Sequence, residues 1–320
     1  MKIQFQSDLP HQSEAISAVV NLFEGQEVCK SEFTVVNTYK QVKDQIAQQG
    51  SLFSTSTFSD TGVGNRLFLL NDEVLDNVQK VQLKNGLKQS DKLSDFDFTI
   101  EMETGTGKTY VYLRSAFELN KNYGFTKFVI VVPSVAIREG VAKSLDITQE
   151  HFKKIYGIDA DWFVYNSAKP TAVRDFATND NLSIMVINID AFKEKTTKKE
   201  GESGQVRMHT RRNDLNDAKP IELIQETNPI VIIDELQSVA TTDKSKDAIK
   251  SLNPLCTLRY SATHIDKLNM LYKLDSIDAY EQKLVKQIEV ASVGIKNDHN
   301  QAYIKLVSVK PQPRSASIEV

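Results

Sequence analysis

The chain contains few of the residues that build disulfide frameworks or zinc sites. Only two of its 320 residues are cysteine, Cys29 and Cys256, and they lie far apart. They provide neither a disulfide framework nor the paired spacing of a zinc site. The five histidines show no paired ligand spacing either. This cysteine usage fits a reducing cytosol, so we expect a cytoplasmic protein.

Hydrophobic segments long enough for a bilayer or a secretory leader are also missing. The longest apolar runs, around 128–132 and 230–233, are far shorter than the roughly 20 residues that span a bilayer. No apolar core follows Met1-Lys2, so no secretory signal is recognised. We therefore expect no membrane association.

The chain also has no excess of positive charge. Lysine and arginine total 39 against 42 aspartates and glutamates, which leaves a net charge of −3. This balance argues against a protein that coats nucleic acid non-specifically, although it leaves room for a local basic groove. The overall composition is that of a soluble globular protein. At about 150 residues per domain, the length suits one large or two ordinary domains.

A glycine turn lies between a strand-like and a helix-like segment. Residues 101–109 read Glu-Met-Glu-Thr-Gly-Thr-Gly-Lys-Thr. Apolar and polar residues alternate over 96–102, which predicts a half-buried strand, and the apolar residues of 110–117 fall on one helical face. A strand, a glycine turn and a helix N-terminus direct backbone N–H groups and the helix dipole at one point. The segment therefore predicts a phosphate site.

Each residue of this turn has an expected role. Lys108 supplies positive charge to the β- and γ-phosphates of a nucleotide, and the Thr109 hydroxyl is a ligand for Mg²⁺. The backbone of the turn holds the phosphates through Thr104, Gly105, Thr106 and Gly107. The strict P-loop pattern has glycine where this chain has Met102.

A second motif supplies carboxylates. Residues 230–233 form a continuous apolar run, as expected for a parallel strand that is covered on both faces. The run ends in Asp234 and Glu235, which places both at the carboxyl edge of the sheet, where open α/β folds bind ligands. We expect Asp234 to coordinate Mg²⁺ and Glu235 to polarise the water that attacks the γ-phosphate.

A third motif, Ser261-Ala262-Thr263, follows a short strand-like stretch at 256–260. Small hydroxyl residues at a strand end can hydrogen-bond both a metal-site carboxylate and a neighbouring segment. This motif suits a relay that couples the nucleotide to a second substrate.

These three motifs, in this order, resemble the first RecA-like domain of superfamily 2 helicases and translocases. The closer resemblance is to the restriction (Res) subunit of type III restriction–modification enzymes. It is carried by residues 99–113, 128–141, 186–192, 259–264 and 274–290, and so covers most of the chain. Where that family usually has Asp-Glu-Pro-Gln, this chain has Asp234-Glu235-Leu236-Gln237. Both carboxylates are retained, with a less rigid turn after them.

The resemblance implies an α/β fold, a RecA-like P-loop NTPase domain with a parallel sheet flanked by helices. It implies ATP and Mg²⁺ as cofactors, duplex DNA as a partner, and a DNA methyltransferase (Mod) subunit as a second partner. Gln12 matches the residue that reads adenine, and a glutamine amide fits the donor and acceptor on the adenine edge. Further residues match the segments that contact the DNA backbone, namely Pro133, Ser134, Arg138 and, less directly, Asn188.

Strand-like and helix-like segments alternate along most of the chain, which predicts a parallel sheet with right-handed crossovers. The expected strands are 33–39, 96–102, 127–132, 162–165, 182–189, 230–234 and 256–260. The expected helices are 14–23, 41–48, 72–84, 110–117, 135–145, 171–177 and 220–226.

We expect residues 1–275 to form the first RecA-like ATPase domain. Within it, residues 193–219 are nearly devoid of apolar side chains and are predicted to be a mobile insertion. Residues 276–320 are expected to begin a following domain that is incomplete, with a truncated β extension at 303–309 and 315–320. An isolated two-stranded ribbon is marginal in water. The expectation is therefore a fragment that lacks a second RecA-like domain and a nuclease domain.

Two other functions remain open from the residues alone. A small-molecule P-loop kinase would need an acceptor pocket and an arginine-bearing lid, and no clear lid is seen in the sequence. A non-catalytic docking module would be a remnant of a motor, although Lys108, Thr109, Asp234 and Glu235 are all intact. A GTPase is disfavoured because no Asn-Lys-x-Asp guanine motif occurs.

Overall fold

The computed structural model divides the chain into two compact units, Met1–Val285 and Lys286–Val320. The structure describes residues 5–28, 31–35, 60–93, 95–191, 207–211, 215, 218–235, 243–264, 267–286, 305–311 and 314–319. The two units are described separately. The predicted boundary after residue 275 precedes helix α10 (Ser276–Glu281), which packs into the larger unit through the buried Ala279.

The larger unit is built on a seven-stranded sheet in which all paired strands are parallel. The strand order is β5-β6-β4-β7-β8-β3-β9. The strands are β3 (Asp97–Met102), β4 (Lys127–Val132), β5 (Asp161–Val164), β6 (Ser183–Asn188), β7 (Ile230–Asp234), β8 (Cys256–Ser261) and β9 (Met270–Leu274). Because the strands are parallel, their carboxyl ends meet at one edge of the sheet.

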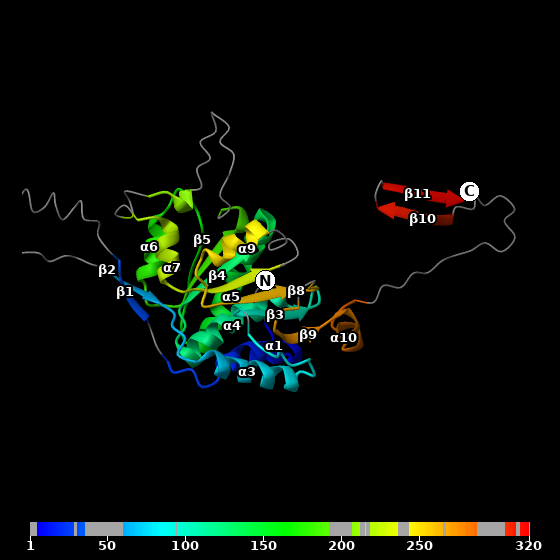
Figure 1. Cartoon of the computed structure of the whole chain (residues 1–320), viewed down its shortest axis with the longest axis horizontal. Coiled ribbons are helices and arrows are strands. Elements are labelled where there is room, and N and C mark those ends of the chain that lie inside the picture. The colour runs from blue at the N-terminus through cyan, green and yellow to red at the C-terminus, as the bar shows by residue number, and fades with distance from the viewer. Residues whose placement is uncertain are drawn as a thin grey trace, which may run out of the picture. The chain divides into compact units, whose positions relative to one another are not determined.

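Helices cover both faces of this sheet, and Figure 1 shows α1 and α3 on one side of the strands and α9 on the other. The first face packs α1 (Pro10–Val20), α3 (Asn71–Lys84), α4 (Lys108–Tyr123) and α5 (Val135–Tyr156). The second packs α6 (Thr171–Thr178), α7 (Pro220–Glu226) and α9 (Asp243–Lys250). Short 3₁₀ helices occur at η1 (Asn21–Phe23), η2 (Ile189–Ala191) and η3 (Arg207–His209). The predicted fold class, a parallel α/β sheet flanked by helices, is confirmed.

Strand β4 explains why some strands read as unbroken apolar runs. Ile130 and Val132 belong to the core under α4 and α5, whereas Val129 and Val131 belong to the core under α6 and α7. Successive side chains of a strand point to opposite faces. A strand covered on both faces therefore needs an apolar residue at every position.

Strand β3 was predicted to be half-buried, and that prediction is wrong. Thr99 is fully buried and Glu101 is 4 % exposed, although both belong to the polar alternation. Phe98, Ile100 and Met102 pack into the first core. His264 and Lys267, from the segment after β8, contact Ile100 and Glu101. The polar residues of β3 are partly compensated by ion pairs, as between Glu101 Oε2 and Lys267 Nζ at 3.5 Å.

Several element boundaries also differ from those predicted. The first helix begins at Pro10 rather than residue 14, because proline suits the first turn of a helix. Helix α5 continues to Tyr156 rather than ending at residue 145. Strand β9 and helix α9 were not predicted. Helix α9 has eight residues, and its buried apolar side chains among the described residues are Ala248 and Ile249.

The segment before the sheet forms a separate hairpin. Strand β1 (Ser31–Val35) pairs antiparallel with β2 (Asp60–Gly64), which was not predicted. The predicted strand 33–39 is present as far as Val35, and the predicted helix 41–48 lies outside the described residues.

Part of the segment 193–219 packs against the protein. Met208 is fully buried and Leu215 is 2 % exposed, and both join the core under α6 and α7. Residues 193–206, 212–214 and 216–217 lie outside the part of the chain that the structure describes. The described residues of this segment therefore include two that help to close the second core.

The smaller unit contains an antiparallel hairpin of β10 (Lys305–Pro311) and β11 (Arg314–Glu319). Both strands fall in the two runs predicted near the C-terminus. Among the described helices of the whole chain, none combines the length and apolar content needed to cross a membrane.

Asn65, directly after β2, joins the hairpin to the start of β4. Its Nδ2 donates to the Lys127 carbonyl at 2.8 Å, and its Oδ1 accepts from the Thr126 and Lys127 N–H groups at 2.8 and 3.1 Å. Asn65 is 1 % exposed, so water cannot replace these contacts.

We expect Asn65→Ala to lower the free energy of unfolding by about 2–4 kcal/mol, because it leaves buried backbone groups without partners. Urea denaturation measures the change. Asn181→Ala is the control, since Asn181 is exposed and bonds only to neighbouring surface groups. A loss for Asn65→Ala no larger than for the control would contradict this role.

Candidate functional site

The glycine turn joins the end of β3 to the start of α4. Gly105 and Gly107 have φ values of +86° and +93°, in the left-handed region that favours glycine. Thr106 closes the turn, with its Oγ1 donating to the Glu103 carbonyl at 2.6 Å. Helix α4 begins at the next residue, Lys108. The N–H groups of its first turn have no intrahelical acceptor and point at the carboxyl edge of the sheet.

Lys108 meets Glu235 at this edge. The Lys108 Nζ and Glu235 Oε1 lie 3.0 Å apart, with the lysine side chain 10 % and the glutamate side chain 35 % exposed. One residue starts α4 and the other directly follows β7, so the fold brings together two motifs separated by more than a hundred positions. Glu235 has a φ of +60°, which is uncommon for a residue other than glycine. Such strain persists only where the surroundings enforce it.

Asp234 lies beside the same helix, buried under α4. It accepts a hydrogen bond from the Tyr112 hydroxyl at 3.1 Å. Burial raises the pKa of Asp234 to about 6, the Tyr112 hydrogen bond and Lys108 oppose that rise, and the Glu235 charge adds to it. Burial likewise raises the pKa of Tyr112 well above its ordinary value, while a hydrogen bond with Thr109 lowers it. Thr109 and Asp234 are therefore neighbours of one buried hydroxyl.

This donor set fits Mg²⁺. A hydroxyl and a carboxylate are hard oxygen ligands, and Mg²⁺ is usually held by one or two protein oxygens together with phosphates and water. Among the described residues, no cluster of three or more histidine, cysteine, aspartate or glutamate side chains forms a complete protein cage. Thr109 and Asp234 are the residues that could hold Mg²⁺ together with the phosphates of a nucleotide.

Gln12 of α1 contacts the glycine turn directly. Its Nε2 donates to the Thr106 carbonyl at 3.1 Å, and the Nε2 of His11 lies 3.1 Å from the same oxygen. A Cβ added at Gly107 would come within 2.3 Å of the Gln12 amide, so the second glycine also makes room for α1. His11 was missed by sequence reasoning, because no local pattern distinguishes it from an ordinary helix residue.

The hydroxyl motif follows β8, which lies next to β7 in the sheet. Tyr260 is in register with Asp234, and its carbonyl accepts from the Glu235 N–H at 3.0 Å. Ser261 is fully buried, and its Oγ has no partner among the described residues. Ala262 is half-buried and Thr263 is exposed. The predicted relay therefore begins beside the acidic pair.

His264 ends the stretch 259–264 that carries the resemblance, but no role was predicted for it. It is 7 % exposed, and its Nε2 lies 3.3 Å from the Ile100 carbonyl of β3. Burial lowers the pKa of His264 to about 4, and the charges of Arg259, Lys267 and Lys108 lower it further, whereas the Ile100 carbonyl raises it. The residue connects the end of the hydroxyl motif to the strand that leads into the glycine turn.

The residues expected at DNA are grouped at the same sheet edge. Asn188 ends β6 in register with Val132 of β4, the residue before Pro133. Ser134 caps α5, with its Oγ accepting from the Ile137 N–H at 3.3 Å. Arg138 pairs with Glu139 at 2.8 Å, so part of its charge is balanced within the chain.

These features define the class of protein. A glycine turn before a helix, a lysine and a hydroxyl at the helix start, and an acidic pair on a nearby strand end are those of a P-loop, RecA-like domain of the helicase type. The family model described as "Type III restriction enzyme, res subunit" matches residues 7–266, and the chain belongs to this family.

Curated relatives carry the same description. The chain is 28 % identical over 304 residues to the type III restriction-modification enzyme EcoP15I Res subunit of Escherichia coli, covering 88 % of this chain and 28 % of that protein. It is also 28 % identical over 305 residues to the EcoPI Res subunit of Escherichia phage P1, covering 89 % of this chain and 28 % of that protein. The chain thus spans little more than a quarter of the length of these relatives.

Two solved structures show weaker similarity. One is a nuclease-deletion mutant of the type ISP restriction-modification enzyme LlaGI with a DNA substrate mimic, at a TM-score of 0.40 and 12 % identity, covering 66 % of this chain and 20 % of that chain. The other is the DUF1998 helicase MrfA bound to DNA, at a TM-score of 0.39 and 14 % identity, covering 78 % of this chain and 33 % of that chain.

The low pKa of His264 predicts a loss of stability in acid. Between pH 6.5 and about 4 the unfolded chain binds a proton at this position and the folded chain does not. The free energy of unfolding therefore decreases as the pH falls through this range, by up to roughly 3 kcal/mol. We expect His264→Gln to be less sensitive to pH, because glutamine does not titrate. Denaturation at pH 7.5, 5.5 and 4.5 tests this, and equal pH dependence of the two proteins would contradict it.

Proposed function

We propose that this chain is the ATP-binding and ATP-hydrolysing motor domain of a type III restriction enzyme, coupling ATP hydrolysis to DNA cleavage. The observation that carries the proposal is the contact between Lys108 and Glu235, with Asp234 and Thr109 beside the same tyrosine. A phosphate-binding cation, a metal-binding carboxylate and a candidate base therefore lie within one small volume. A structural role alone would not require this combination in a strained, partly buried position.

The chemistry assigned to these residues is the hydrolysis of ATP. Lys108 and the N–H groups that start α4 hold the β- and γ-phosphates. Thr109 and Asp234 hold Mg²⁺, which when bound neutralises the charge that develops on the phosphates. When Lys108 turns to a phosphate, Glu235 loses its partner and is able to polarise the attacking water.

Gln12 is proposed to select adenine. Its bond to Thr106 uses one of the two amide N–H groups and orients the side chain. The second N–H suits adenine N7, and the amide oxygen suits the N6 amino group. Guanine presents an acceptor instead of that amino group, so ATP is favoured over GTP.

Coupling to DNA is proposed to run through the ends of β8 and β4. The hydroxyl motif Ser261–Thr263 lies beside the acidic pair Asp234–Glu235. The segment 133–138, together with Asn188, is proposed to contact the DNA backbone. The methyltransferase subunit that accompanies this family is the proposed partner for sequence recognition.

Cleavage of DNA is proposed for a protein of the length of the curated relatives, of which this chain spans 28 %.

Lys108→Ala and Glu235→Gln should separate binding from chemistry. The first removes the phosphate-binding charge, so we expect Mg·ATP affinity to fall at least about tenfold, or ~1.4 kcal/mol. The second keeps the shape of Glu235 but removes its basicity, so we expect binding to persist and turnover to fall by roughly 10²–10⁴. A fluorescent ATP analogue measures binding, and phosphate release measures turnover.

Lys153→Ala is the matched control for Lys108. Lys153 is 59 % exposed and forms a surface ion pair with Asp159 at 2.5 Å, which contributes little to stability. Lys153→Ala should leave both ATP binding and phosphate release unchanged. If Glu235→Gln hydrolysed ATP at the wild-type rate, Glu235 would not be the group that polarises the attacking water.

Duplex DNA should stimulate ATP hydrolysis by the chain, or by a longer protein that contains it. Because Arg138 is proposed to contact the backbone, Arg138→Ala should raise the DNA concentration for half-maximal stimulation more at 50 mM salt than at 150 mM, since the loss of a phosphate contact makes binding less dependent on salt. The measurement is phosphate release with and without DNA. Stimulation by a small metabolite instead would indicate a P-loop kinase, and a longer protein unaffected by DNA would indicate a docking module.

A further inference from the structure

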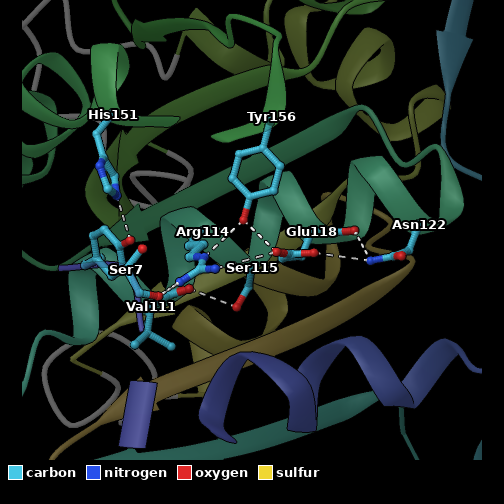
Figure 2. Close-up of polar contacts among 9 residues, drawn as sticks. Ser7, Val111, Arg114, Ser115, Glu118, Asn122, His151 and Tyr156 are labelled. Carbon is cyan, nitrogen blue, oxygen red and sulfur yellow. Dashed lines mark hydrogen bonds and ion pairs between the residues drawn. The ribbon is translucent and has the colours of Figure 1, made fainter. Parts of the chain in front are cut away.

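A basic side chain of α4 holds the segment that precedes Gln12. Arg114 Nη1 donates a hydrogen bond to the carbonyl of Ser7, and Figure 2 shows the arginine directed from the helix to that carbonyl. Ser7 lies before α1 in a stretch without regular secondary structure. A stretch of this kind has no intrasegment hydrogen bonds to fix its path, so its position depends on such contacts.

Arg114 is itself held in place by two neighbours. Its Nε donates to the Tyr156 hydroxyl at 3.0 Å, and that hydroxyl donates to Glu118 Oε1 at 2.7 Å. Burial and the Glu118 charge raise the pKa of Tyr156, so the hydroxyl remains protonated. The hydroxyl therefore accepts from the arginine and donates to the glutamate, in one fixed direction. Figure 2 shows this chain of contacts between α5 and α4.

Aromatic packing holds the same segment beside the phosphate-binding turn. The ring of Phe5 stacks on Tyr110, with centroids 5.9 Å apart and planes at 14°. Tyr110 directly follows Thr109, and its hydroxyl lies 2.9 Å from His151 Nε2. The segment 5–9 thus lies along the N-terminal half of α4.

The other end of the segment reaches the turn itself. His11 and Gln12 both contact the Thr106 carbonyl. Arg114 is six residues after Lys108 on the same helix, a separation of about 9 Å along its axis. One rigid helix therefore carries the residues that bind phosphate at its start and, further along, the residue that anchors the segment bearing Gln12.

We propose that Arg114 is a positioning residue for base recognition, which holds the segment 5–12 so that the Gln12 amide faces the base of a nucleotide. This inference rests on the proposed ATP function. Loss of Arg114 removes a charge-assisted hydrogen bond from the Ser7 carbonyl and releases the segment. Lys108 and Thr109 keep their own contacts. The resulting defect is specific to the base and does not extend to the phosphates.

The test compares three ligands, Mg·ATP, Mg·GTP and Mg·tripolyphosphate, by calorimetry. Arg114→Ala is expected to weaken ATP binding about tenfold, as for the loss of a hydrogen bond from a charged donor. It should bring the ratio of ATP to GTP affinity close to one, while tripolyphosphate affinity changes less than about twofold. Arg114→Lys should recover part of the ATP preference, because an ammonium can reach one acceptor but not form the arginine fork.

Asn122→Ala is the matched control. Asn122 donates to the Glu118 carbonyl at 2.8 Å and to Glu118 Oε2 at 3.4 Å, at the far end of the same network. Within the part of the chain that the structure describes, Asn122 forms no hydrogen bond with Ser7 or Arg114, and it is exposed at the helix end. Its ATP preference should equal that of the wild type.

An equal loss for all three ligands in Arg114→Ala would show a general structural role and overturn the inference, as would an unchanged ratio. If circular dichroism shows that Arg114→Ala does not fold, Tyr156→Phe replaces it in the test. This variant removes only the hydroxyl that orients the guanidinium, and it should reduce the ratio of ATP to GTP affinity. A wild type that binds none of the ligands, or binds ATP and GTP equally, would refute the proposed function and the inference together. A wild type that prefers ATP, with variants that keep the preference, refutes the inference alone.

Discussion

The convergence of α4 and β7 at one edge of a parallel sheet is the constraint on which the rest of the site depends. Parallel strands end at the same edge, and the helix that follows β3 starts there with its N–H groups exposed. Lys108 and Glu235 can therefore meet at 3.0 Å although they belong to distant parts of the chain. Gly105, Gly107 and Glu235 have positive φ values. The backbone strain at Glu235 accompanies its contact with Lys108. Without the sheet, the glycine turn and the acidic pair Asp234–Glu235 would not lie close together.

Burial around this edge tunes the groups that take part. Asp234 is 6 % exposed, and burial disfavours its charged form, yet the Tyr112 hydroxyl and Lys108 support the carboxylate. Ser261 and His264 continue the same polar layer along β8 and back to β3. Buried polar groups with incomplete partners are costly, and here they are concentrated in the strands that carry the glycine turn and the hydroxyl motif.

Helix α4 joins the proposed phosphate site to the N-terminal segment of the chain. It lies between the core of the sheet and the N-terminal segment, and it contacts that segment at both ends, through Thr106 in the preceding turn and through Arg114. In our proposal, recognition of the base and recognition of the phosphates therefore depend on the same rigid helix. Membership in the Res family accounts for the motifs themselves, whereas the arginine anchor follows from the geometry of this chain.

The sequence by itself determined the parallel α/β architecture and the identity of the residues at 104–109 and 234–235, because periodicity and strand-end chemistry are local signals. It misjudged β3, since the burial of a strand face depends on the segments that pack over it, and it also missed β9 and α9. It assigned no role to His11, Tyr112, Arg114 or His264, although His264 belongs to the stretch 259–264 that carries the resemblance. Their roles arise from contacts between α1, α4, α5 and the sheet. Only the tertiary structure decides such contacts, because a hydrogen bond across many residues depends on packing and leaves no periodic trace in the chain.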